Sequence, residues 1–383
     1  MDNFPRAKTA VVGAATFGLG EAHGYSSIEM AAHAGVEALK MAGLRTSDVD
    51  ALFICLPFDA MSGISLAEYY GIHPKLTDNN RTGGSSSVSQ MEHAALALEA
   101  GICDVALITY GSNQRSATGK LQTPVGLGGV ESVYKPRNPV SSYALAAHRH
   151  MHEFGTTREQ LAQVALSARQ WAKLNPEAFE QGDLTLDDVL SSRMVSDPLT
   201  VRDCCLITDG AGAMVMTRAD KARDICKNPA YLLGAAAATT HMSISSMPDL
   251  TRTAAIESGA RAYAQAGVRA ADIDVLSLYD AFTINVLLFL EDLGFCAKGE
   301  GGAFVSDGRI APGGQLPVNT NGGGLSCCHP GQYGMFANIE AIRQVMGLAD
   351  KRQISDVNLA LAHTNGGNLS SQATAIFGSS STV

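Results

Sequence analysis

Aromatic residues, charged residues and long apolar runs are all scarce in this sequence of 383 residues. Only 6% of the residues are aromatic, with a single tryptophan, and only 17% are charged. No apolar run reaches the length of a membrane span, and the first residues lack the apolar core of a signal peptide. The net charge of −9 at pH 7 argues against a nucleic-acid or anionic-membrane surface. Local arginines or helix N-termini could still bind an anionic ligand.

The cysteines exclude further classes of protein. The eight cysteines form no CxxC motif and have no metal-like spacing against histidine, so we expect no metal site. Two vicinal pairs, Cys204-Cys205 and Cys327-Cys328, suit a reducing compartment. The 46% of hydrophobic residues suffice for a large core. We therefore expect a cytoplasmic α/β protein.

One segment of the chain occurs twice. Residues 42–52 (AGLRTSDVDAL) recur as residues 266–276 (AGVRAADIDVL), at a constant offset of 224 positions (267 − 43). Each copy follows an alanine-rich helical stretch and leads into an apolar strand. Solenoid repeats are only a few tens of residues long, so this spacing indicates two homologous α/β halves in one chain. A site at their junction can use loops from both halves.

Apolar periodicity and turn residues predict similar elements in both halves. In the first half, residues 1–225, we expect strands at 7–14, 51–57, 104–110 and 208–216 and helices at 27–41 and 88–100. An insertion over 111–200 interrupts this half, and one of its helices has a capping-box spacing, with Thr156 as N-cap and Glu159 as its partner. In the second half, residues 226–383, we expect strands at 231–238, 275–279, 357–362 and 372–377 and helices at 254–265, 283–293 and 334–346.

A histidine lies between a glycine-rich loop and a predicted helix. The segment 322–331 reads GGGLSCCHPG, and its Pro330 and Gly331 disfavour regular structure around His329. Glycines such as Gly322, Gly323 and Gly324 let the backbone approach a ligand closely. His329 could act as a general base or an oxyanion donor, or could be a structural histidine satisfied by a backbone carbonyl. In this loop we favour the functional interpretation.

Two further segments lie where ligands bind in α/β folds. Tyr279 and Asp280 end an apolar strand, and the carboxyl end of a parallel strand faces the usual ligand crevice. Asp280 could instead cap the following helix through Thr283, and Tyr279 could be a core aromatic residue. The segment 83–87 (GGSSS) offers small residues and free amides at a helix N-terminus, which could hold an anion or an enolate oxygen. It could also be a tight helix entry.

Thiol and hydroxyl nucleophiles have weaker support. Cys327 and Cys328 adjoin His329 and could supply a thiolate, but buried cysteines are more often small hydrophobic residues. No GxSxG elbow surrounds Ser85 or Ser86.

These motifs together resemble the thiolase superfamily, and most of all its sterol-carrier-protein-type branch. The resemblance rests on the duplicated halves, on residues 209–211 (DGA), on 279–282 (YDAF) and on 322–330, in order along nearly the whole chain. It implies a duplicated five-layered αβαβα thiolase fold with an inserted loop domain, and usually a homodimer. It also implies acyl-CoA as the substrate, with no bound cofactor. Such enzymes make or break the bond next to a thioester carbonyl.

The resemblance implies roles for single residues as well. His329 matches the histidine of the family's Gly-His-Pro loop, which activates the nucleophile and helps to form an oxyanion hole, and Cys328 stands where that loop has glycine. Tyr279 takes the place of an Asn or His that orders the oxyanion site. His363 and Gly366 fall in the last active-site loop. Tyr333, one helical turn beyond His329, is a further candidate.

The largest departure from the family is at the nucleophile. The acyl-accepting cysteine of the family falls at Gly84, where no thiol is present. Ping-pong acyl transfer needs that thiolate, because the covalent thioester splits the reaction into two steps.

Three functions remain open at this point. Some superfamily members without the cysteine cleave β-hydroxyacyl-CoA by a retro-aldol reaction, commonly with a small OB-fold, zinc-ribbon partner. That reaction needs a base and an enolate-stabilising donor, for which His329, Tyr279 and the amides after Gly84 are the candidates. Acyl transfer with Cys328 or Ser85 as a relocated nucleophile is the second function. A catalytically silent acyl-CoA-binding scaffold is the third.

Overall fold

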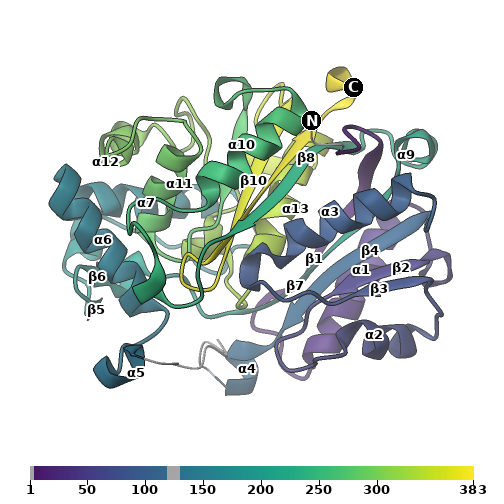
Figure 1. Ribbon diagram of the computed structural model, residues 1–383, viewed down its shortest axis with the longest axis horizontal. Coiled ribbons are helices and arrows are strands. Elements are labelled where there is room, and N and C mark those ends of the chain that lie inside the picture. The colour runs from purple at the N-terminus through teal and green to yellow at the C-terminus, as the bar shows by residue number, and fades with distance from the viewer. Residues whose placement is uncertain (1–3, 119–129) are drawn as a thin grey trace.

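The computed structural model describes residues 4–118 and 130–383, and its strands and helices alternate as the sequence indicates (Figure 1). The first half contains β1 (Thr9–Gly20), α1 (Ser27–Met41), β2 (Ala51–Ile54), α2 (Ser62–Tyr70), β3 (Leu76–Asp78), α3 (Ser86–Glu99), β4 (Val105–Ser112), β7 (Asp209–Arg218) and α9 (Ala219–Ile225). The second half contains β8 (Ala230–Thr239), α10 (Ala255–Ala266), β9 (Val275–Leu278), α11 (Thr283–Asp292), α12 (Gly301–Phe304), α13 (Gly334–Met346), β10 (Leu359–Gly366) and β11 (Ser371–Gly378).

The strands form one mixed sheet in the order β3-β2-β4-β7-β1-β8-β11-β10-β9. Five strands come from the first half and four from the second, and the halves meet where β1 pairs with β8 at Ala10↔Tyr231 and Val11↔Ala230. The expected α/β architecture is confirmed. The two half-sheets are continuous through backbone hydrogen bonds at this seam.

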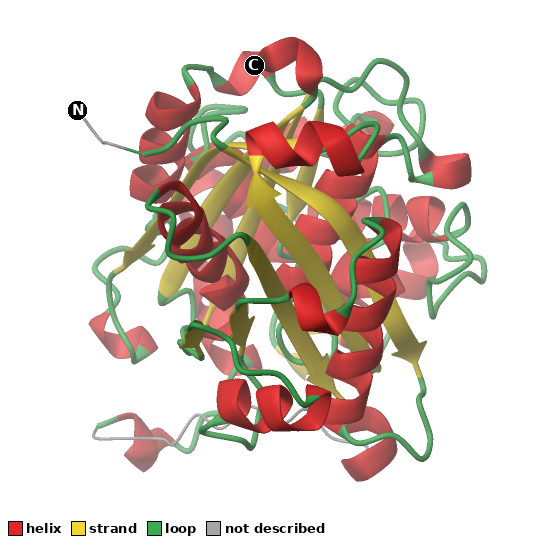
Figure 2. Ribbon diagram, turned by 90° about the vertical axis from the view of Figure 1, so that its right-hand side faces the viewer, coloured by secondary structure: helices red, strands yellow, loops and turns green. Residues whose placement is uncertain are grey.

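Helices cover both half-sheets and separate them. Helix α1 packs on β1, β4 and β7, and α10 packs on β8 and β11. Helices α3 and α13 contact each other and strands of both halves, so they form a central layer between the half-sheets. Figure 2 shows the sheet between layers of helices. The central helices matter for function, because each adjoins a glycine-rich loop identified above. Helix α3 begins at the loop 83–87, and α13 follows the loop 322–331.

The duplicated segment explains why β2-β4-β7-β1 in the first half and β9-β10-β11-β8 in the second have equivalent orders. In each copy an aspartate closes the contact between two parallel strands. Asp50 accepts a hydrogen bond from the backbone N–H of Val105 (2.9 Å), which begins β4. Asp274 accepts one from the backbone N–H of Leu359 (2.9 Å), which begins β10. The equivalent carboxylates of Asp50 and Asp274 therefore fix β4 beside β2 and β10 beside β9, respectively.

The insertion between β4 and β7 is mostly helical. It contains α4 (Gln114–Thr118), α5 (Glu131–Tyr134), α6 (Val140–Phe154), α7 (Arg158–Ala172), α8 (Leu186–Leu190) and the short strands β5 (Met194–Ser196) and β6 (Leu199–Thr200). Residues 119–129 of the insertion lie outside the described residues.

The capping box of α7 is shifted by one residue from the prediction. The N-cap is Thr157 and its partner is Gln160, whereas Thr156 and Glu159 were expected. The reason is that the hydroxyl of Thr156 is hydrogen bonded to Nδ1 of the buried His150 (2.7 Å). The next threonine adopts the extended backbone that an N-cap requires.

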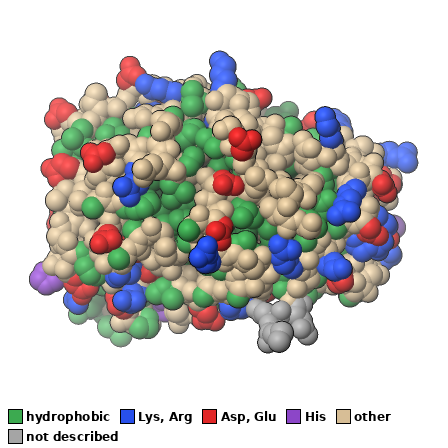
Figure 3. Space-filling model, turned by 90° about the horizontal axis from the view of Figure 1, so that it is seen from above, with side chains coloured by type: hydrophobic (Ala, Val, Ile, Leu, Met, Phe, Trp, Pro, Cys, Tyr) green, Lys and Arg blue, Asp and Glu red, His purple; other side chains and the backbone are tan. Residues whose placement is uncertain are grey.

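The surface fits the acidic composition. On the face shown in Figure 3, acidic and basic side chains are interspersed, and neither sign forms a continuous patch. Within the described ranges 4–118 and 130–383, no helix is long and apolar enough to cross a membrane.

Candidate active site

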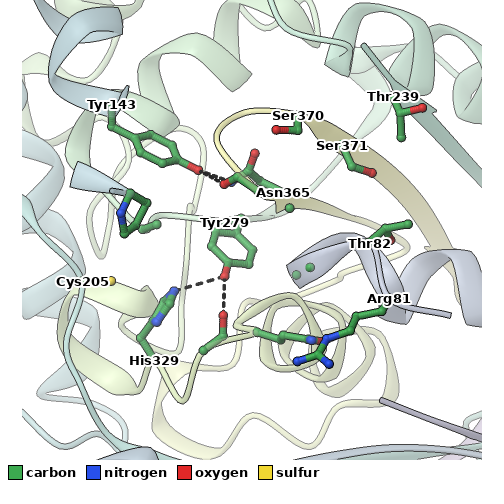
Figure 4. A pocket seen from close by; sticks show the side chains of 18 of the residues that line it. Arg81, Thr82, Tyr143, Cys205, Thr239, Tyr279, His329, Asn365, Ser370 and Ser371 are labelled. Carbon is green, nitrogen blue, oxygen red and sulfur yellow. Dashed lines mark hydrogen bonds between the residues drawn. The ribbon is translucent and has the colours of Figure 1, made fainter. Parts of the chain in front are cut away.

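A cavity of about 410 Å³ opens where loops of the two halves meet (Figure 4). The first half contributes the start of α3, the end of β4 and the insertion, and the second half contributes loops after β8, β9, β10 and before α13. The polar and aromatic residues that line it are Arg81, Thr82, Tyr110, Tyr143, Cys205, Thr239, His241, Tyr279, Phe282, His329, Gln332, Asn365, Ser370 and Ser371. The expected site at the junction of the halves therefore corresponds to a real cavity.

The ring of Tyr279 occupies the space in which a side chain at position 84 would project. A Cβ placed on Gly84 would lie 2.2 Å from Cε2 of Tyr279 and 2.5 Å from the backbone oxygen of Asn365. Both distances are far below ordinary contact, so glycine at position 84 and tyrosine at position 279 depend on each other sterically. The space beside position 84 is thus filled by a phenol from the other half.

Tyr279 and His329 form a hydrogen-bonded pair in the cavity wall. The Tyr279 hydroxyl lies 3.1 Å from Nε2 of His329, 3.3 Å from the carbonyl oxygen of Gly331, and 3.2 Å from the backbone N–H of Tyr333, which donates to it. Burial lowers the pKa of His329 to about 4, so its imidazole is neutral at pH 7. Burial raises the pKa of Tyr279 well above its usual range, so its phenol stays protonated. Within the pair, the neutral imidazole can accept a proton, and the phenol is a hydrogen-bond donor whose hydrogen is directed at the Gly331 carbonyl oxygen in this structure.

The N-terminus of α3 reaches the cavity through Gly83 and Gly84. The loop after β10 packs tightly against it, because a Cβ on Gly366 would lie 1.8 Å from the carbonyl oxygen of Thr82. Gly366 lines the cavity, but Ser85 does not. The Ser85 hydroxyl is buried and donates to the Thr82 carbonyl oxygen (2.8 Å), with Ser371 Oγ at 2.9 Å. The helix end supplies partial positive charge, and the serine is structural.

Asp280 holds the glycine-rich loop and does not face the cavity. Its carboxylate accepts hydrogen bonds from the backbone N–H groups of Gly324 (2.6 Å) and Leu325 (3.3 Å). Gly323 must be glycine, because its φ is +66° and a Cβ would lie 2.0 Å from Asp280 Oδ2. Asp280 does not cap α11 through Thr283, whose hydroxyl donates to Asp203 (2.9 Å). Burial raises the pKa of Asp280 to about 7.

Several residues that we expected at the site lie behind the cavity wall. The Tyr333 hydroxyl donates to Asn321 (2.9 Å), and the Ser86 hydroxyl accepts from the Thr82 backbone (2.9 Å). His363 lies inside the sheet, where burial lowers its pKa to about 3. Cys328 is buried, and burial raises the pKa of its thiol well above the usual range. None of these four side chains lines the cavity, and neither do Gly322, Gly323 and Gly324.

The cavity residues that the sequence analysis missed include Arg81, Tyr143, Cys205 and Asn365. Asn365 directly precedes Gly366, and Cys205 belongs to a vicinal pair, but nothing in the sequence placed either one at the site. Burial raises the pKa of the Cys205 thiol well above its usual range, so it is a thiol and not a thiolate at neutral pH. The Arg81 guanidinium donates to the Pro57 carbonyl oxygen at the cavity rim.

The described residues contain no group of three or more His, Cys, Asp or Glu side chains that could hold a metal ion. The cavity therefore offers neutral hydrogen-bonding groups, the N-terminus of α3 and the Arg81 side chain.

Comparisons with known proteins identify the family to which the chain belongs. Residues 236–379 match the family model "Thiolase C-terminal domain-like". The chain is 32% identical to an acetyl-CoA acetyltransferase of Methanothermobacter thermautotrophicus over 96% of this chain and 98% of that protein. It is 35% identical to a steroid side-chain-cleaving aldolase of Thermomonospora curvata over 85% and 86% of the two chains.

A solved structure named Ltp2-ChsH2(DUF35) aldolase superposes with a TM-score of 0.88 at 33% identity, covering 97% of this chain and 98% of that chain. The predicted resemblance is thereby confirmed: the chain belongs to the thiolase superfamily, in its sterol-carrier-protein-type branch.

Proposed function

We propose that this protein cleaves β-hydroxyacyl-CoA thioesters by a retro-aldol reaction, without a covalent enzyme intermediate. The observation that carries the proposal is the Tyr279 ring, which fills the space beside Gly84 and is hydrogen bonded to His329. Acyl transfer through position 84 has neither a thiol nor the room for one. An acceptor and a donor side by side suit the proton movements of an aldol cleavage.

In the proposed reaction His329 is the base. It takes the proton of the β-hydroxyl group, the Cα–Cβ bond breaks, and the β-carbon leaves as a ketone or aldehyde. The bonding electrons pass to the thioester, which becomes an enolate. Tyr279, still protonated, donates a hydrogen bond to the charge that develops, and the N-terminus of α3 favours it electrostatically. The proton held by His329 then returns to Cα and gives the shortened acyl-CoA.

Coenzyme A thioesters need no resident cofactor for this chemistry, because the thioester carbonyl itself accepts the electrons. The eight cysteines are free thiols, which suits the reducing environment of the cytoplasm.

We propose a small DUF35-type partner of OB-fold and zinc-ribbon construction for this chain, besides a homodimer. The support is the solved aldolase complex, whose larger chain is matched over nearly its full length. Co-purification from the native host should yield a heteromer. Recovery of the chain as a homodimer alone, under conditions that preserve activity, would contradict this part of the proposal.

Acyl transfer remains the second candidate, because the Cys205 side chain lines the cavity and an acetyltransferase is among the relatives. Its raised pKa opposes this role. The burial of Cys328 and Ser85 away from the cavity argues against either one as a relocated nucleophile.

Two measurements test the proposal. The first is turnover of a panel of β-hydroxyacyl-CoA esters by the wild type and by His329→Ala, for which we expect cleavage and its loss, respectively. Unchanged turnover in the variant would remove His329 as the base. The second is the intact mass after incubation with acyl-CoA. We expect no adduct, and a mass increase equal to the acyl group, abolished by Cys205→Ala, would establish acyl transfer instead.

A further inference from the structure

Asn365 presents an unused hydrogen-bond donor to the cavity. The residue is only 2% exposed, and its side chain lines the cavity. One N–H of its amide donates to the Tyr143 hydroxyl (2.7 Å), and its Oδ1 accepts from Nε2 of Gln372 (2.8 Å). The second N–H has no hydrogen-bond partner within residues 4–118 and 130–383. In the view of Figure 4, Tyr279 lies between Asn365 on one side and His329 on the other.

Neighbouring groups fix which way the Asn365 amide points. Nε2 of Gln372 also donates to the backbone carbonyl oxygen of Leu369 (3.2 Å), and a carbonyl can only accept. The NH₂ group of Gln372 therefore faces Leu369 and Asn365, which requires Oδ1 of Asn365 on that side. The NH₂ group of Asn365 must then face Tyr143 and the cavity.

The buried His363 stabilises this orientation from behind. Its Nε2 lies 3.0 Å from Oε1 of Gln372, and its Nδ1 lies 2.9 Å from the hydroxyl of Thr374. Since Oε1 is an acceptor, Nε2 of His363 carries the proton and Nδ1 accepts from the threonine. In the chain of hydrogen bonds from Thr374 through His363 and Gln372 to Asn365, each side chain thus donates to the next, and the last donor faces the cavity.

Tyr143 holds the amide from the cavity side. Its hydroxyl donates to the carbonyl oxygen of Gly367 (3.0 Å), so its oxygen can only accept from Asn365. Its ring stacks on Phe282, with ring centroids 4.3 Å apart. Both neighbours of the Asn365 amide are therefore rigid.

Asn365 also lies beside the N-terminus of α3. Its backbone oxygen is one of the three atoms that would obstruct a side chain on Gly84, and Gly366 is packed against Thr82. An oxygen atom in the cavity beside Asn365 could thus receive a hydrogen bond from its amide while lying near the partial positive charge of the helix end.

We propose that Asn365 donates its free N–H to the thioester oxygen as the enolate forms, and that His363 and Gln372 are positioning residues for this amide. The inference rests on the proposed aldol function and deepens it, because it assigns the enolate oxygen to the wall formed by Asn365 and α3. His329 then takes the proton of the β-hydroxyl group, and Tyr279 remains a second donor to the charge that develops on the thioester.

The test is exchange of the Cα hydrogens of acetyl-CoA and propionyl-CoA with D₂O, followed by mass spectrometry. This partial reaction forms the enolate and does not require the ketone to be known. Asn365→Ala should lower the exchange rate at saturation about 10²–10³-fold, the usual loss for one oxyanion donor, with little change in KM. Asn365→Asp, of equal size, should lose as much, because it replaces the N–H by a carboxylate oxygen.

Gln372→Met should reduce the same rate about 10-fold with little change in KM, because the Asn365 amide can then rotate. A purely structural role would change the unfolding midpoint without this selective loss of rate. Asn368→Ala is the matched control. It lies in the same loop, does not line the cavity, and its side-chain amide atoms are buried without a hydrogen-bond partner in the part of the chain that the structure describes.

The outcomes separate the two proposals. Exchange by the wild type that depends on His329 but is unchanged in Asn365→Ala would overturn the inference and leave the aldol function standing. A wild type that exchanges neither thioester would overturn both. Loss of exchange in Asn368→Ala equal to that in Asn365→Ala would show a general effect of the loop and would also refute the role of Asn365.

Discussion

The steric dependence of position 84 on Tyr279 leads to a quantitative prediction for Gly84→Ala. The added methyl group would lie 2.2 Å from Cε2 and 2.8 Å from Cζ of the tyrosine. The ring cannot simply turn aside, because its hydroxyl is hydrogen bonded to His329 and Tyr333 and the residue is only 4% exposed. We therefore expect the substitution to displace Tyr279 and to reduce both stability and activity.

The magnitude follows from two costs. Overpacking a well-filled core costs about 1–3 kcal/mol. Displacing the tyrosine hydroxyl leaves the Tyr333 N–H without its acceptor, which costs about 1–3 kcal/mol more. Gly84→Ala should thus lower the free energy of unfolding by about 2–6 kcal/mol in urea titrations followed by circular dichroism. Gly182→Ala is the control, because nothing lies within 4 Å of a Cβ there, and it should change stability by less than about 0.5 kcal/mol.

A double-mutant cycle isolates the contact itself. In a Tyr279→Ala background the methyl group at position 84 loses its two contacts with the ring and keeps only the one with the Asn365 oxygen. The two substitutions should therefore be less destabilising together than the sum of their separate effects, by about 1–3 kcal/mol. Additive effects would refute the steric argument for glycine at position 84.

Three further predictions concern single side chains. Tyr279→Phe keeps the ring and removes the donor, so turnover of a β-hydroxyacyl-CoA should fall about 10²-fold, and full activity would contradict its role. His363 has a folded-state pKa of about 3 against an ordinary 6.5, so only the unfolded chain binds its proton between these values. Stability should consequently fall as the pH drops below 6.5, and less steeply in His363→Gln, in urea titrations at pH 7.5 and 5. Asp280 has the opposite sign, because its folded pKa is about 7 against 3.8. The stability that the protonated carboxyl contributes at low pH is lost as the pH rises through 7. Asp280→Asn should make this decline shallower. Wild type and variant whose free energies of unfolding fall in parallel with pH would contradict the role of Asp280.

The fold was predictable from the sequence because its determinants are local or repeated. The duplicated segment contains the aspartate that fixes the order of the parallel strands, and the glycines that end the helices are visible in the sequence. The one-residue error at Thr156 arose because a tertiary contact with His150 competes with the cap, and spacing alone does not contain that information.

The site was predictable only where a motif is contiguous. His329, Tyr279 and Gly84 lie in recognisable loops, and the structure brings these three together. Asn365 and Tyr143 come from segments that meet only in the folded chain, so no spacing reveals them. His363 was expected to touch the substrate, but it lies behind Gln372, because a strand alternates its side chains between two faces.

The seam between the half-sheets limits how substrate can reach the cavity. Many enzymes with a site between two lobes open by a hinge, which separates the lobes. Here β1 is hydrogen bonded to β7 on one side and to β8 on the other, so such opening would break backbone pairing in the middle of the sheet. Entry and product release should therefore depend on rearrangement of the exposed side chains of the cavity lining, such as Arg81 and Met242, while Tyr279 and His329 keep fixed positions.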